Sequence, residues 1–129
     1  MKTLKKNQRG QALVEFALVV PMLVLVVIAI VEFSRIWETL NLLTSAAREG
    51  ARVASLTNPV STSQATTAAQ NVLTAGGIST PPTITVSGPN ASNEVTVTVQ
   101  VMFVPATGLS IPGISYRQLQ RQATMRWEG

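Results

Sequence analysis

One acidic side chain stands alone in a long apolar stretch near the N-terminus. Glu15 lies in the run QALVEFALVVPMLVLVVIAIV, five residues after Gly10 and four after Gln11. A carboxylate near a hydrocarbon layer costs about 2–4 kcal/mol unless it meets a cation. Gln11 lies four residues before Glu15, on the same helix face, where a cation could neutralise the carboxylate. The alternative is a carboxylate in the headgroup region, favoured by the positive end of the helix dipole.

Other residues capable of chemistry are scarce. The chain has no cysteine and no histidine, so zinc sites and most nucleophile or acid–base arrangements lack their usual members. Six glutamates, the serines and threonines and one tyrosine remain. We therefore expect a protein that is not an enzyme and that uses no metal and no cofactor.

The charge is concentrated at the N-terminus. The net charge is +4, but four of the ten basic residues, Lys2, Lys5, Lys6 and Arg9, precede Gln11 and leave six arginines against six glutamates. A nearly neutral remainder offers no basic face for nucleic acid. The basic leader predicts that the N-terminus stays in the cytoplasm and that Glu32–Gly129 lies outside.

Residues 12–31 predict a single transmembrane helix. At 1.5 Å per residue these twenty residues span about 30 Å, the thickness of a bilayer core. The run is longer than the apolar region of a cleaved signal peptide, and it ends in Glu32-Phe33-Ser34-Arg35, so we favour a signal anchor. Pro21 lacks the N–H that would bond the carbonyl of Ala17 and is expected to kink or loosen the helix. Pro21 is either an ordinary proline of a membrane helix or a position where local loosening lets the helix change shape between two environments.

The helical pattern continues beyond the bilayer. Apolar and small residues recur at spacings of three and four from Ile36 to Ala54. A packing face of small residues is expected at Ala47, Gly50, Ala51 and Ala54. Three i,i+3 pairs, Glu32–Arg35, Arg35–Glu38 and Glu49–Arg52, are expected mainly to solubilise the helix. Arg48 and Arg52 are either part of this solvated face or candidate contacts to a partner carboxylate.

The remainder predicts a small α+β domain. Ser61-Thr62-Ser63-Gln64 matches a capping box, and a helix of about twelve residues should follow and stop at Gly76-Gly77. Period-two alternation then predicts three antiparallel strands: one around Ile84 and Val86, one over 95–103 and one over 116–127. The segment Val104–Ile114, which displays Leu109, Ile111 and Ile114, is either a crossover packed on the domain or a partner-binding loop.

The predicted fold class is thus α+β, with a long N-terminal transmembrane and stalk helix followed by one short helix and a three-stranded antiparallel sheet. The predicted regions are a leader over 1–10, a transmembrane helix over 11–32, its extracytoplasmic continuation over 33–56 and a small domain over 57–129. A unit of about 73 residues without disulfides is marginal alone, so we expect it to dock on the stalk helix or on a partner.

Three sequence segments in the N-terminal part of the chain resemble a known family. Arg9-Gly10-Gln11 with Glu15-Phe16 resembles the processing site of type IV prepilins, and RGQALVEFALVVP with VEFSR and AAREGAR resembles the TadE-like pseudopilins of tight-adherence pilus systems. The resemblance extends from Arg9 to about Ala54.

The resemblance implies a bacterial inner-membrane precursor cleaved after Gly10 and a pilin-like subunit assembled through its N-terminal helix. Such cleavage would free the α-amine of Gln11 on the same helix face as Glu15, where the two charges can neutralise each other. In the family the same glutamate is thought to pair with the amine of a neighbouring subunit, and either pairing explains the acid. The implied partners are a prepilin peptidase, other pilins or pseudopilins, the inner-membrane assembly platform and the lipid bilayer. The alternatives are a membrane-anchored scaffold that never enters the filament and, less favoured because aromatics are few, a surface-binding module on a stalk.

Overall fold

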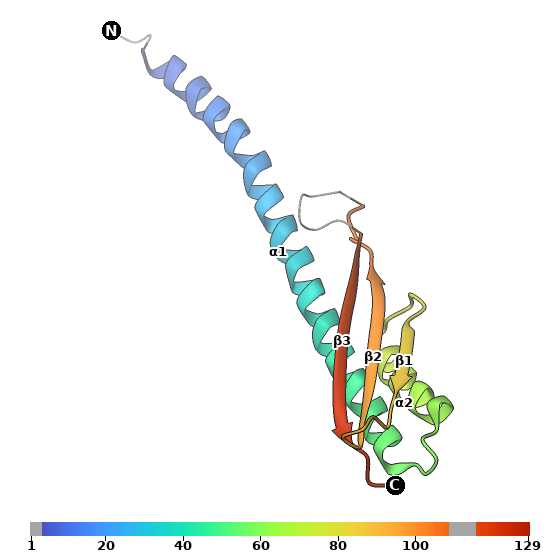
Figure 1. Ribbon diagram of the computed structural model, residues 1–129. Coiled ribbons are helices and arrows are strands. Elements are labelled where there is room, and N and C mark those ends of the chain that lie inside the picture. Colours follow the sequence, from blue (N-terminus) through green and yellow to red (C-terminus); the bar gives the residue numbers. More distant parts are fainter. Residues whose placement is uncertain (1–3, 109–115) are drawn as a thin grey trace.

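The protein is described here by a computed structural model that covers residues 4–108 and 116–129. A single helix, α1 (Leu4–Leu56), extends far beyond a small domain that lies along its C-terminal half (Figure 1). The domain consists of helix α2 (Thr62–Ala75) and strands β1 (Thr83–Ser87), β2 (Glu94–Phe103) and β3 (Arg117–Arg126). The predicted α+β class and its order of elements are confirmed.

Helix α1 has two parts with different surroundings. Between Gly10 and Val31 its side chains are mostly exposed and apolar, and this helix is long and apolar enough to cross a bilayer. From Leu43 to Ala54 one face is buried by the domain. The periodic apolar face thus continues from the membrane segment into the domain core without a break in the helix.

Helix α2 begins at Thr62, directly after Ser61, the first residue of the predicted capping box. The hydroxyl of Ser61 accepts a hydrogen bond from the Gln64 N–H at 3.4 Å, as a capping residue does. The helix ends at Ala75, and the Ile78 N–H donates to the Leu73 carbonyl at 3.1 Å across the two glycines. Its buried residues Ala65 and Ala69 face α1 and the sheet.

The sheet is antiparallel in the order β1-β2-β3. Val97 is paired with Val86 on one side and with Ala123 on the other. Odd-numbered residues of β2, from Val95 to Phe103, are buried, because strand side chains alternate between the two faces. Strand β3 is one residue shorter at each end than the strand predicted over 116–127.

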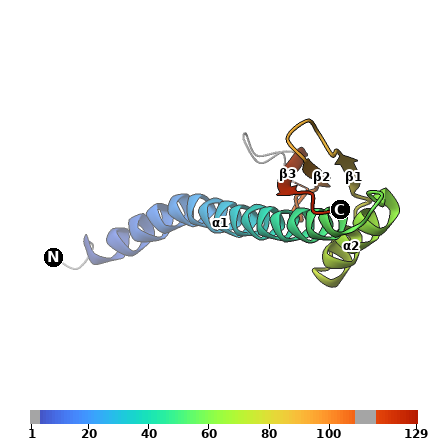
Figure 2. The same cartoon turned by 60° about the horizontal axis from the view of Figure 1, so that its bottom comes forward.

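The two faces of the sheet differ in chemistry. The outer face is a polar ladder in which Gln118 donates to Gln100 at 3.0 Å and Gln100 donates to Gln120 at 2.8 Å. The inner face covers α1, with α2 beside it (Figure 2). Because three antiparallel strands can bury only one face, α1 and α2 together supply the second layer.

One core unites the domain with the helix. Leu43, Ala51 and Ala54 of α1 belong to the same buried cluster as Leu73 of α2 and Val99 of β2. The expectation that residues 57–129 dock on the stalk helix is therefore met within the chain. The predicted partner-contact residues Leu109, Ile111 and Ile114 lie outside the described residues.

Candidate functional site

The predicted processing site lies on the exposed N-terminal part of α1. Gly10 is exposed, and a Cβ placed on it would have no neighbour within 4 Å. The side-chain amide of Gln11 donates to Glu15 Oε1 at 3.4 Å, which places positions 11 and 15 on one helix face. The Glu15 side chain is exposed, so both groups are accessible to an enzyme or to a neighbouring subunit.

The chain stays helical on both sides of Pro21. Its missing N–H leaves the carbonyl one turn earlier without its helix partner, which is the usual physical origin of a bend. Figure 2 shows the helix curving within its blue, N-terminal part.

The predicted small-residue face lies at the junction of three elements. Ala47, Ala51 and Ala54 have no exposed surface, and Gly50 is buried with them. A Cβ on Gly50 would lie 3.1 Å from Val97 Cγ1 of β2, 3.2 Å from the Ala65 carbonyl oxygen and 3.2 Å from Ala69 Cβ of α2. The surface that approaches this face is thus the protein's own α2 and sheet.

The two arginines proposed as partner contacts are both exposed. Arg52 forms a two-point ion pair with Glu49, from Nη2 to Oε1 at 2.7 Å and from Nε to Oε2 at 3.0 Å. The hydrogen bonds from Arg52 hold the pKa of the Glu49 carboxyl below its usual value, against a smaller opposing effect of burial. Arg48 is thus the better placed of the two to reach a partner.

Glu32 is the main functional candidate that the sequence reasoning missed. Its side chain is 1% exposed, and its Oε1 accepts hydrogen bonds from the N–H of Thr107 at 3.1 Å and from the Thr107 hydroxyl at 3.3 Å. Arg35 Nη1 lies 3.1 Å from the other carboxylate oxygen. The expectation that the Glu32–Arg35 pair merely solubilises the helix is wrong, because the domain covers the carboxylate.

We call this arrangement the Glu32 clamp, meaning the contacts of Glu32 with Thr107 and Arg35. Thr107 lies 75 residues further along the chain, so the clamp joins the end of the apolar segment to the segment after β2. Arg35 pairs with Glu32, whereas Glu38, expected to share Arg35, forms no ion pair with it in the part of the chain that the structure describes. Glu32 is the first charged residue after the apolar run, but its spacing to Arg35 is that of any surface pair, so the sequence carried no signal of its burial.

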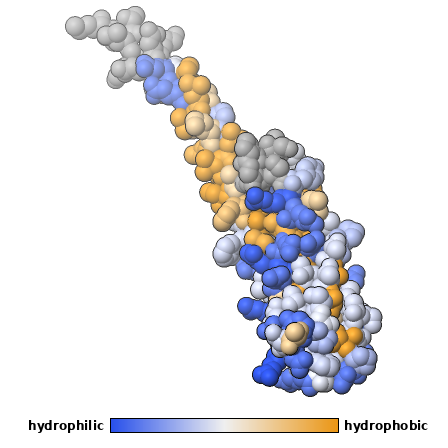
Figure 3. All heavy atoms as spheres, in the orientation of Figure 1, coloured by the Kyte–Doolittle hydropathy of each residue, from blue (hydrophilic) through white to orange (hydrophobic). Residues whose placement is uncertain are grey.

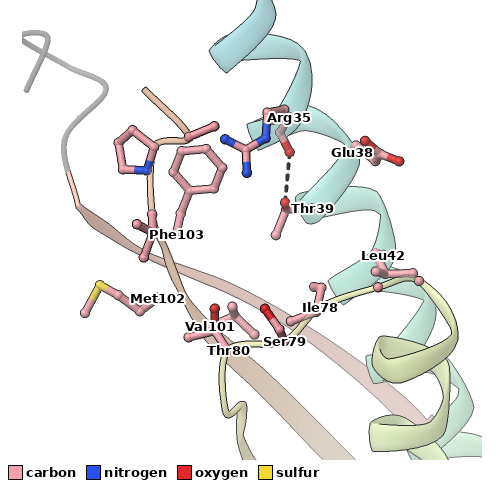
Figure 4. A pocket seen from close by; sticks show the side chains of 15 residues that line it. Arg35, Glu38, Thr39, Leu42, Ile78, Ser79, Thr80, Val101, Met102 and Phe103 are labelled. Carbon is pink, nitrogen blue, oxygen red and sulfur yellow. Dashed lines mark hydrogen bonds between the residues drawn. The ribbon is translucent and has the colours of Figure 1, made fainter. Parts of the chain in front are cut away.

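Arg35 also contacts the sheet. Its guanidinium carbon lies 5.5 Å from the centre of the Phe103 ring, within cation–π distance. Figure 4 shows this contact at the edge of a groove of about 530 Å³, bounded by α1, the segment after α2 and the end of β2. Thr39, on the same face of α1, donates its hydroxyl to the Arg35 carbonyl at 2.8 Å. The Arg35 guanidinium thus contacts the Glu32 carboxylate and the Phe103 ring, while 41% of the side chain stays exposed.

No group of three or more acidic, histidine or cysteine side chains is placed to hold a metal ion within residues 4–108 and 116–129. The arrangement instead consists of an exposed apolar helix with one acid, a buried junction to a small domain, and a clamp between them. Figure 3 shows the apolar surface of the helix emerging from the more polar domain. These features define a protein anchored by one membrane helix that carries an α+β domain.

Comparison with protein families gives a more particular assignment. The model of the family described as TadE-like protein matches residues 10–52, from the predicted cleavage glycine to the small-residue face. This match confirms the resemblance to TadE-like proteins over residues 10–52, about a third of the chain. No curated protein and no solved structure matched the chain.

Proposed function

We propose that this protein is a pilin-like subunit of a bacterial tight-adherence pilus, made as a precursor that is cut after Gly10 and assembled through its N-terminal helix. The observation that carries the proposal is the match to the TadE-like family over residues 10–52, which begins at Gly10 and includes Glu15. Exposure of this part of α1 supports it, because a membrane peptidase and a neighbouring subunit both need access.

Glu15 neutralises an amine during assembly. After cleavage the amine of Gln11, or that of an adjacent subunit, supplies the cation that the carboxylate requires in an apolar contact. The Gln11–Glu15 hydrogen bond supports the intramolecular version of this pairing, because it brings the two residues together on one face. Pro21 lets the helix adapt between bilayer and filament.

The proposed topology follows from charge and apolar length. The basic leader stays in the cytoplasm, residues 11–32 cross the inner membrane, and the stalk over 33–56 and the unit over 57–129 lie outside. A reporter that is active only in the cytoplasm, fused after Gly129, should stay silent. Cytoplasmic activity of that fusion would reverse the orientation.

Cleavage is tested by intact mass of protein extracted from membranes of a host that has the prepilin peptidase. The wild-type chain should begin at Gln11, and Gly10→Val should retain the leader. The valine has room on the helix, so a change in processing would report recognition and not a disturbed fold. Ala17→Val adds similar bulk seven residues further along and should be processed. A wild-type chain that keeps Met1–Gly10 would sink the precursor hypothesis.

Assembly is tested separately. Glu15→Ala should be cut normally while pilus formation falls, because an ammonium is left without its partner in an apolar contact. Glu38→Ala, which removes an exposed acid outside the membrane segment, is the matched control and should assemble. Immunogold labelling of sheared pili with an antibody to the C-terminal domain separates a filament subunit from a scaffold. Labelling confined to membranes would favour the scaffold.

A further inference from the structure

The Glu32 clamp fixes the height of the domain relative to the membrane segment. Glu32 directly follows the apolar residues 12–31. Its carboxylate oxygen lies 3.1 Å from the Thr107 N–H. If residues 12–31 fill the hydrocarbon core, Thr107 lies at the outer edge of that core. The segment that leads from β2 to Thr107 must then lie at the level of the lipid headgroups.

The helix rise gives the depth of the neighbouring residues. Arg35 lies four residues after Val31, which corresponds to about 6 Å along the helix axis. The headgroup layer on each side of the core is about 5–8 Å thick. The centre of the Phe103 ring lies 5.5 Å from the Arg35 guanidinium carbon, so the ring lies within about one helical turn of the height of that group. The membrane-proximal end of β2 therefore reaches the headgroup layer.

The side chains around this height include types that bilayer interfaces favour. Along the axis Phe33 lies about 3 Å and Trp37 about 9 Å beyond Val31, and helix side chains point back toward the N-terminus. Phe33 and Trp37 on α1 are each 61% exposed, Val104 after β2 is 44% exposed, and Tyr116 before β3 is 62% exposed. Aromatic rings with a polar atom are enriched at the membrane–water interface, where one end is apolar and the other is hydrated.

Two arginines accompany the apolar side chains. Arg35 keeps 41% of its side chain exposed, and Arg117, which pairs with Phe103 in the sheet, is exposed. Long basic side chains reach phosphate groups while their methylene stems cover apolar surface. We define the membrane collar as these residues together: Phe33, Arg35, Trp37, Val104, Tyr116 and Arg117.

We propose that the membrane collar rests on the extracytoplasmic leaflet, so that the domain is docked on lipid headgroups at the membrane-proximal ends of β2 and β3 before any subunit contact is made. The inference rests on the membrane anchoring given under Proposed function and is independent of cleavage after Gly10. We take the surface that covers the collar to be phospholipid, because the collar directly follows the membrane segment. The Glu32 clamp holds the domain part of the collar against that segment.

The absence of cysteine makes the docking directly measurable. Single cysteines at Ala106, Ala91 and Val24 carry a spin label in the full chain, reconstituted in nanodiscs of phosphatidylcholine and phosphatidylglycerol at three to one. Collisions with oxygen, which concentrates in lipid, and with a water-soluble nickel chelate give the depth of each label. Ala106 lies next to Thr107. Ala91 is the control position for Ala106 and lies in the β1–β2 hairpin, at the far end of the sheet. Both alanines are exposed.

Docking predicts that nickel collisions at Ala106 fall several-fold below those at Ala91, while oxygen collisions rise. The double variant Val104→Asp/Tyr116→Asp should return the Ala106 label to the values of Ala91 while the label at Val24 stays deep. Equal, aqueous values at Ala106 and Ala91 with a deep Val24 would overturn the docking and leave the anchor intact. Shielding of Ala106 from both reagents would mean that a second protein copy, and not lipid, covers the collar. An aqueous label at Val24 would refute the anchor as well.

Discussion

Replacement of Gly50 by leucine tests the packing at the junction of α1, α2 and the sheet. The first added carbon already lies 3.1–3.2 Å from atoms of Val97, Ala65 and Ala69, and three more carbons must follow it. Overpacking a filled core costs about 1–3 kcal/mol and sometimes more. Leucine gains roughly 1 kcal/mol of helix propensity over glycine. Because three separate elements must move, we place the cost at the upper end and expect a net loss of about 2 kcal/mol.

The assay is thermal unfolding of the full chain in detergent, monitored by near-UV circular dichroism. For a domain of this size, 1 kcal/mol corresponds to about 4–8 °C, so Gly50→Leu should lower the Tm by about 8–16 °C. Ser45→Leu, on the exposed face of the same helix, should change it little. A Gly50→Leu protein with a raised Tm and an unchanged spectrum would show that the face is not packed, and would refute the reasoning.

Three further outcomes are expected. Glu32→Ala should speed hydrogen exchange at the Thr107 amide and destabilise that segment by about 1–3 kcal/mol, because the amide loses its hydrogen bond to a buried, charged carboxylate. Arg52→Gln should raise the pKa of Glu49 toward its ordinary value in an NMR titration. In the wild-type protein the ion pair stabilises the fold at pH values above the ordinary pKa of a glutamate. This contribution is lost as the pH falls through the lowered pKa of Glu49. Trp127→Phe should cost about 1 kcal/mol in thermal unfolding, because the indole N–H donates to a backbone carbonyl at the end of α1 at 3.0 Å.

The first of these has a matched control variant, and each has an outcome that would contradict it. Glu38→Ala removes an exposed acid from the same helix and should leave the exchange at Thr107 unchanged. Faster exchange in both variants would assign the effect to loss of charge and not to the clamp. A Glu49 pKa that does not move in Arg52→Gln, or a Trp127→Phe protein as stable as the wild type, would remove the role assigned to that contact.

The elements could be predicted because their signals are local. Alternating valines gave β2, and the capping box with two glycines bounded α2, since both patterns depend on neighbours within a few residues. The spacing of small residues around Gly50 indicated close packing. It did not indicate that α2 and β2 form the opposing surface, because that depends on how the chain folds back.

The clamp could not be predicted for a similar reason. An i,i+3 pair such as Glu32–Arg35 has the same spacing whether water or protein covers it. Burial of Glu32 depends on Thr107, 75 residues away, which lies in a segment without periodicity. The carboxylate that governs the height of the domain was therefore indistinguishable in the sequence from a surface charge.

The two attachments of the sheet to α1 have a mechanical consequence. Besides the Glu32 clamp at one end, the far end is held by Trp127, whose indole N–H bonds the Thr57 carbonyl, and by the Glu128 N–H, which donates to Ser55 at 3.1 Å. The helix between Glu32 and Ser55 rises about 35 Å, close to the roughly 34 Å length of a ten-residue strand. A force that stretches α1 therefore acts on both attachments at the same time and in a direction parallel to the strands. The sheet resists stretching of the helix between Glu32 and Ser55.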